Sequence, residues 1–205
     1  LQNSGLGNTV NPLLSLADKE VYSLPLIVLI GWRGEPGVKD EPQHIKQGRV
    51  TPSLLDSMEI PYKILTGDSD ESSELAKWAT EQALSTNAPV ALLVQKGAFD
   101  KAEKKRQNIE KTDHLLSREE AIETITNILG NSSTIVATTG MISRELYEQR
   151  DALNQDRSTD FLTVGSMGHA SQIALGIARA KNSRQIVCLD GDGAALMHMG
   201  GMATI

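Results

Sequence analysis

The chain has 205 residues, of which 40% are hydrophobic and 22% are charged, and its formal net charge is −6. This composition predicts a folded protein of one large or two small domains, and the acidic balance argues against a surface for nucleic acid or for an anionic membrane. No apolar run approaches the ~20 residues of a membrane span, and the single cysteine excludes a disulfide framework within the chain, so we expect a cytoplasmic protein that acts on a small molecule.

Short apolar runs along the chain predict β-strands. In chain order they are 26–30, 64–65, 90–94, 135–137, 162–164 and 186–189. Stretches with helical periodicity separate most of them, and Leu75, Trp78 and Ala79 mark one face of such a helix. Alternation of short strands with helices is typical of α/β domains, in which helices cover both faces of a parallel sheet.

Two local signals predict where helices begin. Thr51 followed by Pro52 offers an N-cap and a proline at the first helical position, so a helix is expected to start there. Ser117 with Glu120 three residues later makes a capping box, which predicts a second helix start.

A strongly charged segment divides the chain. Between residues 96 and 119 the apolar periodicity fades and no strand run occurs. We interpret residues 98–117 as a linker between two α/β domains, 1–97 and 118–205, because domain boundaries fall in polar segments of this kind.

Glycine-rich turns are candidates for phosphate binding. A dinucleotide site requires the pattern Gly-x-Gly-x-x-Gly between a strand and a helix. The segments GLGNTV (5–10), GWRGEPG (31–37) and GDGAAL (191–196) each depart from this pattern. A nicotinamide or flavin site therefore stays an alternative only.

The turn after the last apolar run suggests a metal site instead. Asp192 stands between Gly191 and Gly193, where a helix is expected to begin. A carboxylate beside the free N–H groups of a helix N-terminus can hold a divalent cation that bridges a diphosphate. The alternative is that Asp192 only caps the helix.

Two longer segments resemble the thiamine-diphosphate-dependent 2-oxo acid decarboxylases. TVGSMGHASQIALGIARAKNSRQIVCLDGDGAAL (163–196) is similar to their diphosphate-binding domain, and residues 1–65, above all GWRGEPGVKDEPQH (31–44), are similar to their pyrimidine-binding domain. The resemblance implies an α/β fold of two thiamine-diphosphate-binding-type domains, each a parallel sheet flanked by helices and each incomplete in this chain. Residues 1–97 would be the pyrimidine-binding domain and 118–205 the diphosphate-binding domain.

The resemblance also assigns roles to residues. Met167 would be the wedge that holds the coenzyme bent, with Gly165 and Ser166 beside it, and Asp192 would bind Mg²⁺. The residues that would surround the diphosphate are Gly191, Gly193, Ala194 and Ala195, the last three through their N–H groups. Met167 could instead be an ordinary core residue, since methionine fills irregular gaps.

On the substrate side, the resemblance implies a catalytic role for His44, in a loop, because histidine serves naturally as a general acid or base. Arg33 and Arg49 would supply positive charge for an anionic substrate, and Lys39 and Lys46 lie in the same region of the sequence. Asn3 and Ser4, in a turn, would lie near the reacting end of the coenzyme. A solvated charged loop without a catalytic role is the alternative for this region.

The activity implied is decarboxylation of 3-phosphonopyruvate to phosphonoacetaldehyde and carbon dioxide in phosphonate biosynthesis, with thiamine diphosphate and Mg²⁺ as cofactors. Sulfopyruvate is the alternative substrate, and a non-catalytic binding module of the same fold is the alternative from another class. The family forms its sites between subunits, which implies a homo-oligomer. Its activating glutamate would precede residue 1 and an asparagine pair near the metal would follow residue 205, so we expect this chain alone to be inactive.

Overall fold

A computed structural model of the chain describes residues 1–101, 115–130 and 132–205. It consists of two compact units, Leu1–Lys105 and Arg106–Ile205. Most of the predicted linker, 98–117, lies outside the described residues.

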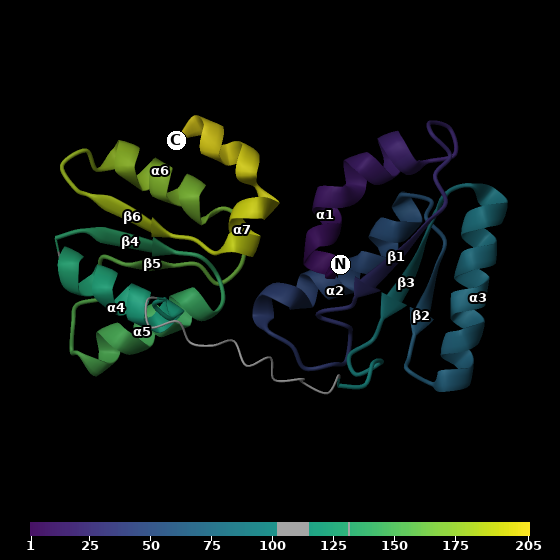
Figure 1. The fold of residues 1–205 in the computed structure, drawn as a ribbon, viewed down its shortest axis with the longest axis horizontal. Helices are drawn as coiled ribbons and strands as arrows, with labels where there is room; N and C mark the ends of the chain where they lie inside the picture. Colours follow the sequence, from purple (N-terminus) through teal and green to yellow (C-terminus); the bar gives the residue numbers. More distant parts are fainter. Residues whose placement is uncertain (102–114, 131) are drawn as a thin grey trace. The chain divides into compact units, whose positions relative to one another are not determined.

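The first unit is a parallel sheet between two helical layers (Figure 1). Its strands are β1 (Leu26–Gly31), β2 (Tyr62–Leu65) and β3 (Pro89–Val94), in the order β1-β3-β2. Its helices are α1 (Asn3–Pro12), the π-helical turn η1 (Leu13–Ala17), α2 (Pro42–Ser57) and α3 (Ser69–Thr86). Every residue of the central strand β3 is buried, as expected for the continuous apolar run of a strand covered on both faces.

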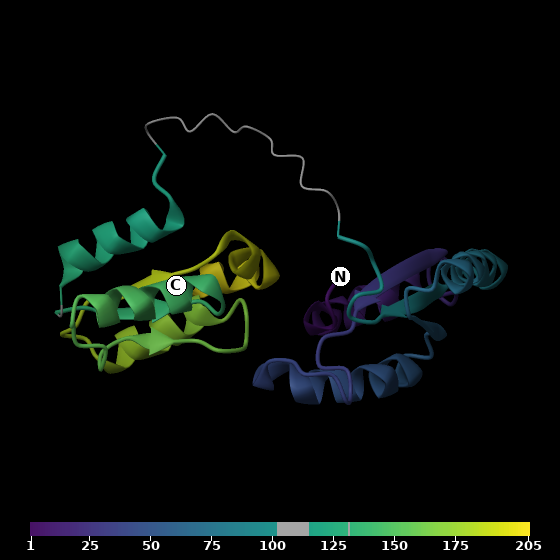
Figure 2. The same ribbon diagram turned by 90° about the horizontal axis from the view of Figure 1, so that it is seen from below.

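Two apolar clusters form the core of this unit, one on each face of the sheet. Leu6 of α1 and Leu55 of α2 pack with Ile30 on one face. On the other face, Leu75 and Ala79 of α3 pack with Val90, Leu92 and Val94 of β3. Figure 2 shows α2 and α3 on opposite sides of the strands.

The second unit is also a parallel sheet with helices on both faces. Its strands are β4 (Thr134–Ala137), β5 (Phe161–Leu162) and β6 (Ile186–Leu189), in the order β5-β4-β6. Its helices are α4 (Arg118–Leu129), α5 (Met141–Ala152), α6 (Ala170–Ala180), α7 (Asp192–Met197) and the 3-10 helix η2 (Met199–Thr204). Ile122 of α4 and Leu146 of α5 pack on one face of β4, and Ala170 and Ala174 of α6 pack on the other.

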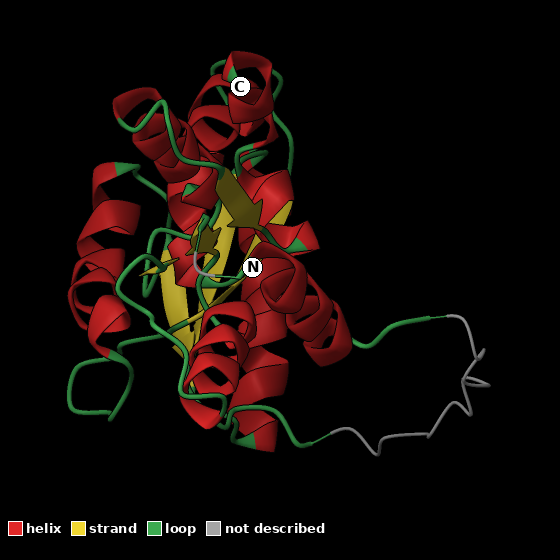
Figure 3. Ribbon diagram, turned by 90° about the vertical axis from the view of Figure 1, so that its left-hand side faces the viewer, coloured by secondary structure: helices red, strands yellow, loops and turns green. Residues whose placement is uncertain are grey.

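The predicted fold class is confirmed: both sheets are parallel and helices flank their strands (Figure 3). All of the predicted strands form, although β5 ends at Leu162 and not at residue 164. The capping box of α4 is also confirmed, because Ser117 accepts a hydrogen bond from the N–H of Glu120 and the Glu120 side chain accepts one from the N–H of Ser117.

The predicted helix start at Thr51 is wrong. Helix α2 begins at Pro42 and continues through Thr51 and Pro52. A proline inside a helix has no N–H for the carbonyl four residues earlier, which here is that of Gly48. The indole Nε1 of Trp32 donates to this carbonyl at 2.8 Å, so the oxygen keeps a hydrogen-bond partner and the helix tolerates the proline.

Across the described ranges, no helix is both long enough and apolar enough to cross a membrane.

Candidate functional site

The carboxyl ends of three strands meet at one edge of the second sheet, because β4, β5 and β6 are parallel. Backbone hydrogen bonds continue beyond the strands: the N–H of Thr138 donates to the carbonyl of Leu189 at 2.9 Å, and that of Thr163 donates to Ala137 at 3.1 Å. This edge of a parallel α/β sheet is where such folds bind ligands.

The turn after β5 packs against α7. Gly168 has φ +93°, and a Cβ at this position would lie 3.0 Å from the carbonyl oxygen of Ala194 and 2.6 Å from the ring of His198. Ser166 also has a left-handed backbone, with φ 54°. Only a residue without a side chain allows so close an approach at Gly168. The turn therefore brings Gly168 against α7 and Met167 beside Gly193 in the first turn of that helix.

Met167 is not a core residue. Its side chain is 42% exposed and belongs to neither buried cluster of the second unit. Its terminal methyl group lies only 3.4 Å from the position that a Cβ on Gly193 would take. Met167 thus projects over the glycine that follows Asp192, which removes the alternative of ordinary core packing.

Asp192 occupies the first helical position of α7, and Gly191 is the N-cap. The alternative that Asp192 is the capping residue is therefore wrong, and its side chain is exposed. The N–H of Ala195 donates to the carbonyl of Gly191 at 2.8 Å, inside the helix. Ala195 consequently has no free donor for a diphosphate, which corrects its predicted role, while Gly193 and Ala194 lie in the first turn, where N–H groups have no intrahelical acceptor.

Two buried polar atoms at this edge have no hydrogen-bond partner among the described residues. They are Oδ2 of Asp190 and Oγ1 of Thr138, which follow the neighbouring strands β6 and β4. An unsatisfied buried polar atom costs about 1–3 kcal/mol, so such atoms usually mark a bound polar ligand or water. Our sequence reasoning missed both residues. The sequence does contain a signal for Thr138: the segment Thr138-Thr139-Gly140 follows the apolar run 135–137 directly, as Asp190-Gly191 follows the run 186–189.

The donors at this edge fit Mg²⁺ held together with a diphosphate. In the described part of the chain, no group of three or more His, Cys, Asp or Glu residues could hold a metal ion by itself. Mg²⁺ does not need such a group, since it is usually bound by one or two carboxylates, phosphate oxygens and water. Asp192 supplies an exposed carboxylate for this arrangement, and Asp190 and Thr138 each supply a buried oxygen at the same edge that has no partner among the described residues.

Cys188, two residues before Asp190, is suited to packing and not to nucleophilic chemistry. Burial, with a smaller contribution from the negative charge of Asp190, raises the pKa of its thiol to about 11. A raised pKa keeps the thiol protonated at neutral pH, and the thiolate is the reactive form.

We therefore expect Cys188 to react with iodoacetamide about 100-fold more slowly at pH 8 in the native chain than in the chain unfolded in urea. The native rate should rise about tenfold per pH unit between pH 8 and pH 10, because the thiolate fraction grows in that proportion below the pKa. Mass spectrometry of the alkylated chain over time measures both rates. Equal rates in the native and unfolded chains would contradict the expectation.

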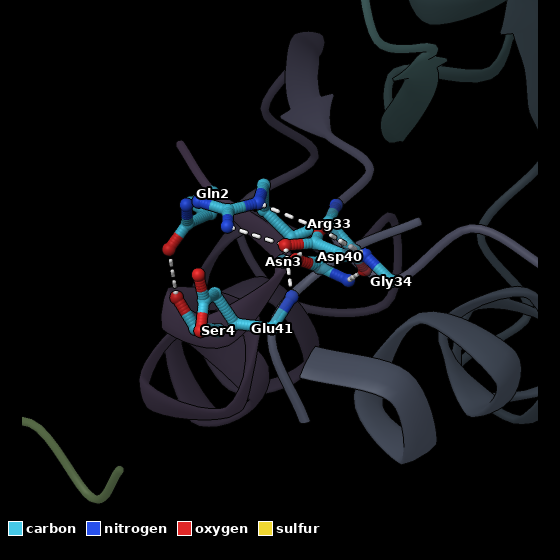
Figure 4. A network of polar contacts seen from close by, with 7 residues as sticks. All are labelled: Gln2, Asn3, Ser4, Arg33, Gly34, Asp40 and Glu41. Carbon is cyan, nitrogen blue, oxygen red and sulfur yellow. Dashed lines mark hydrogen bonds and ion pairs between the residues drawn. The ribbon is translucent and has the colours of Figure 1, made fainter. Parts of the chain in front are cut away.

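In the first unit, Arg33 and Asp40 close the loop between β1 and α2 (Figure 4). The Nε of Arg33 donates to Oδ2 of Asp40 at 2.8 Å, and its second guanidinium nitrogen bonds the other oxygen. The N–H groups of Gly34 and Glu41 also donate to this carboxylate, each at 2.8 Å. The hydrogen bonds from Arg33, with those from the backbone, hold the pKa of Asp40 well below its usual range.

Asn3 joins this loop to both neighbouring helices. Its amide nitrogen donates to the carbonyl of Arg33 at 2.8 Å and to Oγ1 of Thr51 at 3.0 Å, and its amide oxygen accepts from the N–H of Arg33 at 3.2 Å. The side chain is buried. Asn3 and Ser4 lie in the first turn of α1, so the predicted turn at these residues is wrong. Ser4 donates to the side chain of Gln2 at 2.6 Å.

His44 lies in the first turn of α2, so its predicted place in a loop is wrong. It is partly buried, and its Nδ1 is buried without a hydrogen-bond partner in the described residues. The loop packs tightly onto this helix: a Cβ on Gly34 would lie 1.9 Å from the carbonyl oxygen of His44, and one on Gly48 would lie 1.9 Å from that of Gly34. Arg49, on the same helix, is exposed.

This contact predicts that Gly34→Ala lowers the free energy of unfolding of the first unit by about 2–4 kcal/mol. Left-handed backbone costs an alanine about 1 kcal/mol, and forcing an atom into a filled space adds about 1–3 kcal/mol. Gly37→Ala is the matched control, because Gly37 also has positive φ, +85°, but no atom lies within 4 Å of its Cβ position. Gly37→Ala should lose only about 1 kcal/mol. Urea unfolding followed by the fluorescence of Trp32 and Trp78 measures both, and equal losses would contradict the packing argument.

The candidate residues thus form two groups, one in each unit. Asn3, Arg33 and His44, with Ser4 and Arg49, belong to the first unit, and Met167 and Asp192, with their neighbouring turn residues, belong to the second.

The chain is similar to several known proteins. Residues 137–205 match the family described as thiamine pyrophosphate enzyme, C-terminal TPP binding domain. The whole chain is 34% identical to a phosphonopyruvate decarboxylase from Streptomyces viridochromogenes, of which it covers 53%, and 29% identical to a sulfopyruvate decarboxylase from Methanosarcina acetivorans, of which it covers 55%. A sulfopyruvate decarboxylase subunit beta from Methanothermobacter thermautotrophicus is 44% identical over 44% of this chain and 45% of that subunit.

The whole chain aligns with three of the curated relatives, and it spans about half of their length. The family resemblance that the sequence suggested is confirmed by the relatives and by the matched domain. The chain is therefore similar over its whole length to phosphonopyruvate and sulfopyruvate decarboxylases, and its residues 137–205 match the C-terminal TPP binding domain of thiamine pyrophosphate enzymes.

Proposed function

We propose that the complete protein is a carboxy-lyase that uses thiamine diphosphate and Mg²⁺ to convert 3-phosphonopyruvate to phosphonoacetaldehyde and carbon dioxide, in phosphonate biosynthesis. The observation that carries this proposal is the identity of 34% and 35% to two phosphonopyruvate decarboxylases over the whole chain. The matched thiamine pyrophosphate domain at 137–205 supports the choice of coenzyme.

In this proposal the edge of the second sheet holds the diphosphate end of the coenzyme. Asp192 binds Mg²⁺, and the N–H groups of Gly193 and Ala194 face the diphosphate. Met167 supports the bent coenzyme, which its exposed position over Gly193 allows. When bound, thiamine diphosphate supplies a nucleophilic carbon and an electron sink for decarboxylation.

The first unit supplies the proton and the contacts to the substrate. His44 transfers a proton, as its unpartnered Nδ1 permits. Asn3 and Arg33 act by shaping the loop, because their polar groups are engaged inside the unit. The protein works in the cytoplasm as a homo-oligomer with sites between subunits, and the relatives named as alpha and beta subunits support an assembly of several chains.

Sulfopyruvate is the second candidate substrate, because a sulfopyruvate decarboxylase also matches the whole chain at 29% identity. Phosphonate and sulfonate are both tetrahedral anions, so the same cationic groups could bind either. A non-catalytic module of the same fold is the remaining alternative.

The test is aldehyde formation by the complete protein with thiamine diphosphate and Mg²⁺. Phosphonopyruvate, sulfopyruvate and pyruvate are supplied in parallel at equal concentration. We expect phosphonopyruvate to give the highest kcat/KM. A higher kcat/KM for sulfopyruvate would make sulfopyruvate the substrate in place of phosphonopyruvate. No turnover of any of the three acids would favour the non-catalytic module.

A further inference from the structure

A pocket of about 560 Å³ lies between the loop after β1 and helix α2. The loop residues 34–40 line one side, and Ile45 and Arg49 of α2 line the other. Gly34 and Gly37 both have positive φ, and both line this pocket. The pocket adjoins His44, because Ile45 is the next residue of α2 and Gly34 packs on the carbonyl of His44.

The acidic groups of this pocket are already bound by other side chains. Asp40 accepts hydrogen bonds from Arg33. The carboxylate of Glu35 accepts one from the amide of Gln95, which reaches it from beyond β3. Neither acid is therefore directed at the cations of the pocket.

The cations of the pocket are available for a ligand. Lys39 and Arg49 are exposed, and within the ranges that the structure covers neither forms an ion pair. Arg33, by contrast, is committed to Asp40. Lys46 is exposed on α2 but does not line the pocket. Four cations lie close together in this part of the sequence. Lys39 and Arg49 line the pocket and form no ion pair within the described ranges, whereas Arg33 is paired with Asp40 and Lys46 lies outside the pocket.

We propose that Lys39 and Arg49 bind the tetrahedral phosphonate of the substrate in this pocket, and that Arg33 is a positioning residue that holds the loop through Asp40. This inference rests on the proposed function and specifies its substrate contacts. A phosphonate with two negative charges matches two cations, since the guanidinium fork engages two oxygens at once and the lysine adds a point charge.

The test uses kinetics of the complete protein with Lys39→Gln, Arg49→Gln and, as the comparison, Lys46→Gln. We expect the KM for phosphonopyruvate to rise at least tenfold in Lys39→Gln and in Arg49→Gln, with kcat changed less than threefold, because a lost contact to a non-reacting group weakens binding throughout the reaction. Lys46→Gln should leave both constants within twofold of the wild type. The KM for pyruvate, which has no phosphonate, should not change in any variant.

Two results would overturn the pocket assignment: an equal rise of KM in Lys46→Gln, or a rise for pyruvate as large as that for phosphonopyruvate. If the complete protein turns over none of the acids, the proposed function fails, and the role of Lys39 and Arg49 in the pocket is then tested by ligand binding alone. Calorimetric titration with methylphosphonate, an inert probe, should then show at least tenfold weaker binding in Lys39→Gln and Arg49→Gln than in Lys46→Gln. Equal affinities would overturn the inference.

Discussion

Replacing Asp192 with asparagine in the complete protein is expected to lower kcat/KM for decarboxylation by at least about 100-fold at a fixed Mg²⁺ concentration. Residues that only orient metal ligands cost 10- to 100-fold when they are changed, so loss of a direct ligand should cost at least the upper value. Asparagine keeps the shape of the side chain but removes its charge, and Mg²⁺ prefers charged oxygen ligands. Because Asp192 is exposed, the substitution should change the stability of the second unit by less than about 0.5 kcal/mol.

Asp151→Asn is the matched control for Asp192→Asn. Asp151 is an exposed carboxylate of the same unit, and its ion pair with Arg157 is on the surface. It should retain wild-type kcat/KM. Steady-state rates over a range of Mg²⁺ concentrations measure both variants, and raising Mg²⁺ should recover part of the activity of Asp192→Asn. Activity of Asp192→Asn within threefold of the wild type at low Mg²⁺ would remove Asp192 from the metal site.

The strands could be predicted because their signal is local. Each predicted strand is a short apolar run, and the run 90–94 lies in β3, whose residues are all buried. The extent of α2 in the first unit depends instead on a distant group. Thr51 and Pro52 look like a helix start, but the indole of Trp32 satisfies the carbonyl that the proline leaves free, and the helix passes through them.

The candidate site was predictable in part for the same reason. The turns at Met167 and Asp192 carry recognisable residues, and the structure brings them together. Thr138 and Asp190 were missed because only the folded chain shows that their oxygens are buried without partners. The engagement of Arg33 by Asp40 is equally invisible to composition and spacing, since nothing in the sequence distinguishes Arg33 from Arg49.

Replacing Arg150 with methionine is expected to lower the free energy of unfolding of the second unit by about 3–5 kcal/mol. Arg150 is fully buried in α5, and its Nε donates to Oδ2 of Asp160 at 3.0 Å. Its guanidinium also donates to the side-chain oxygen of Gln155 at 3.0 Å. The Asp160 side chain is only 2% exposed, so the substitution leaves a buried carboxylate without its cation. Amide hydrogen exchange of β4 measures the loss, because both tryptophans lie in the first unit.

The control for this prediction is Arg157→Met. Arg157 pairs with the exposed Asp151 and lies over the ring of Tyr147, and such surface contacts together contribute only about 1 kcal/mol.

The pH dependence of the Arg150→Met loss identifies its cause. Burial already raises the pKa of Asp160, and hydrogen bonds from Arg150 oppose this effect. Without Arg150 the folded-state pKa rises further above that of the unfolded chain, so the folded variant binds the proton more tightly and loses stability as pH increases through the raised pKa. The difference in stability between Arg150→Met and the wild type should therefore be smaller at pH 5 than at pH 8. A difference that does not vary with pH would point to lost packing of the arginine stem, and not to the buried charge, as the origin of the loss.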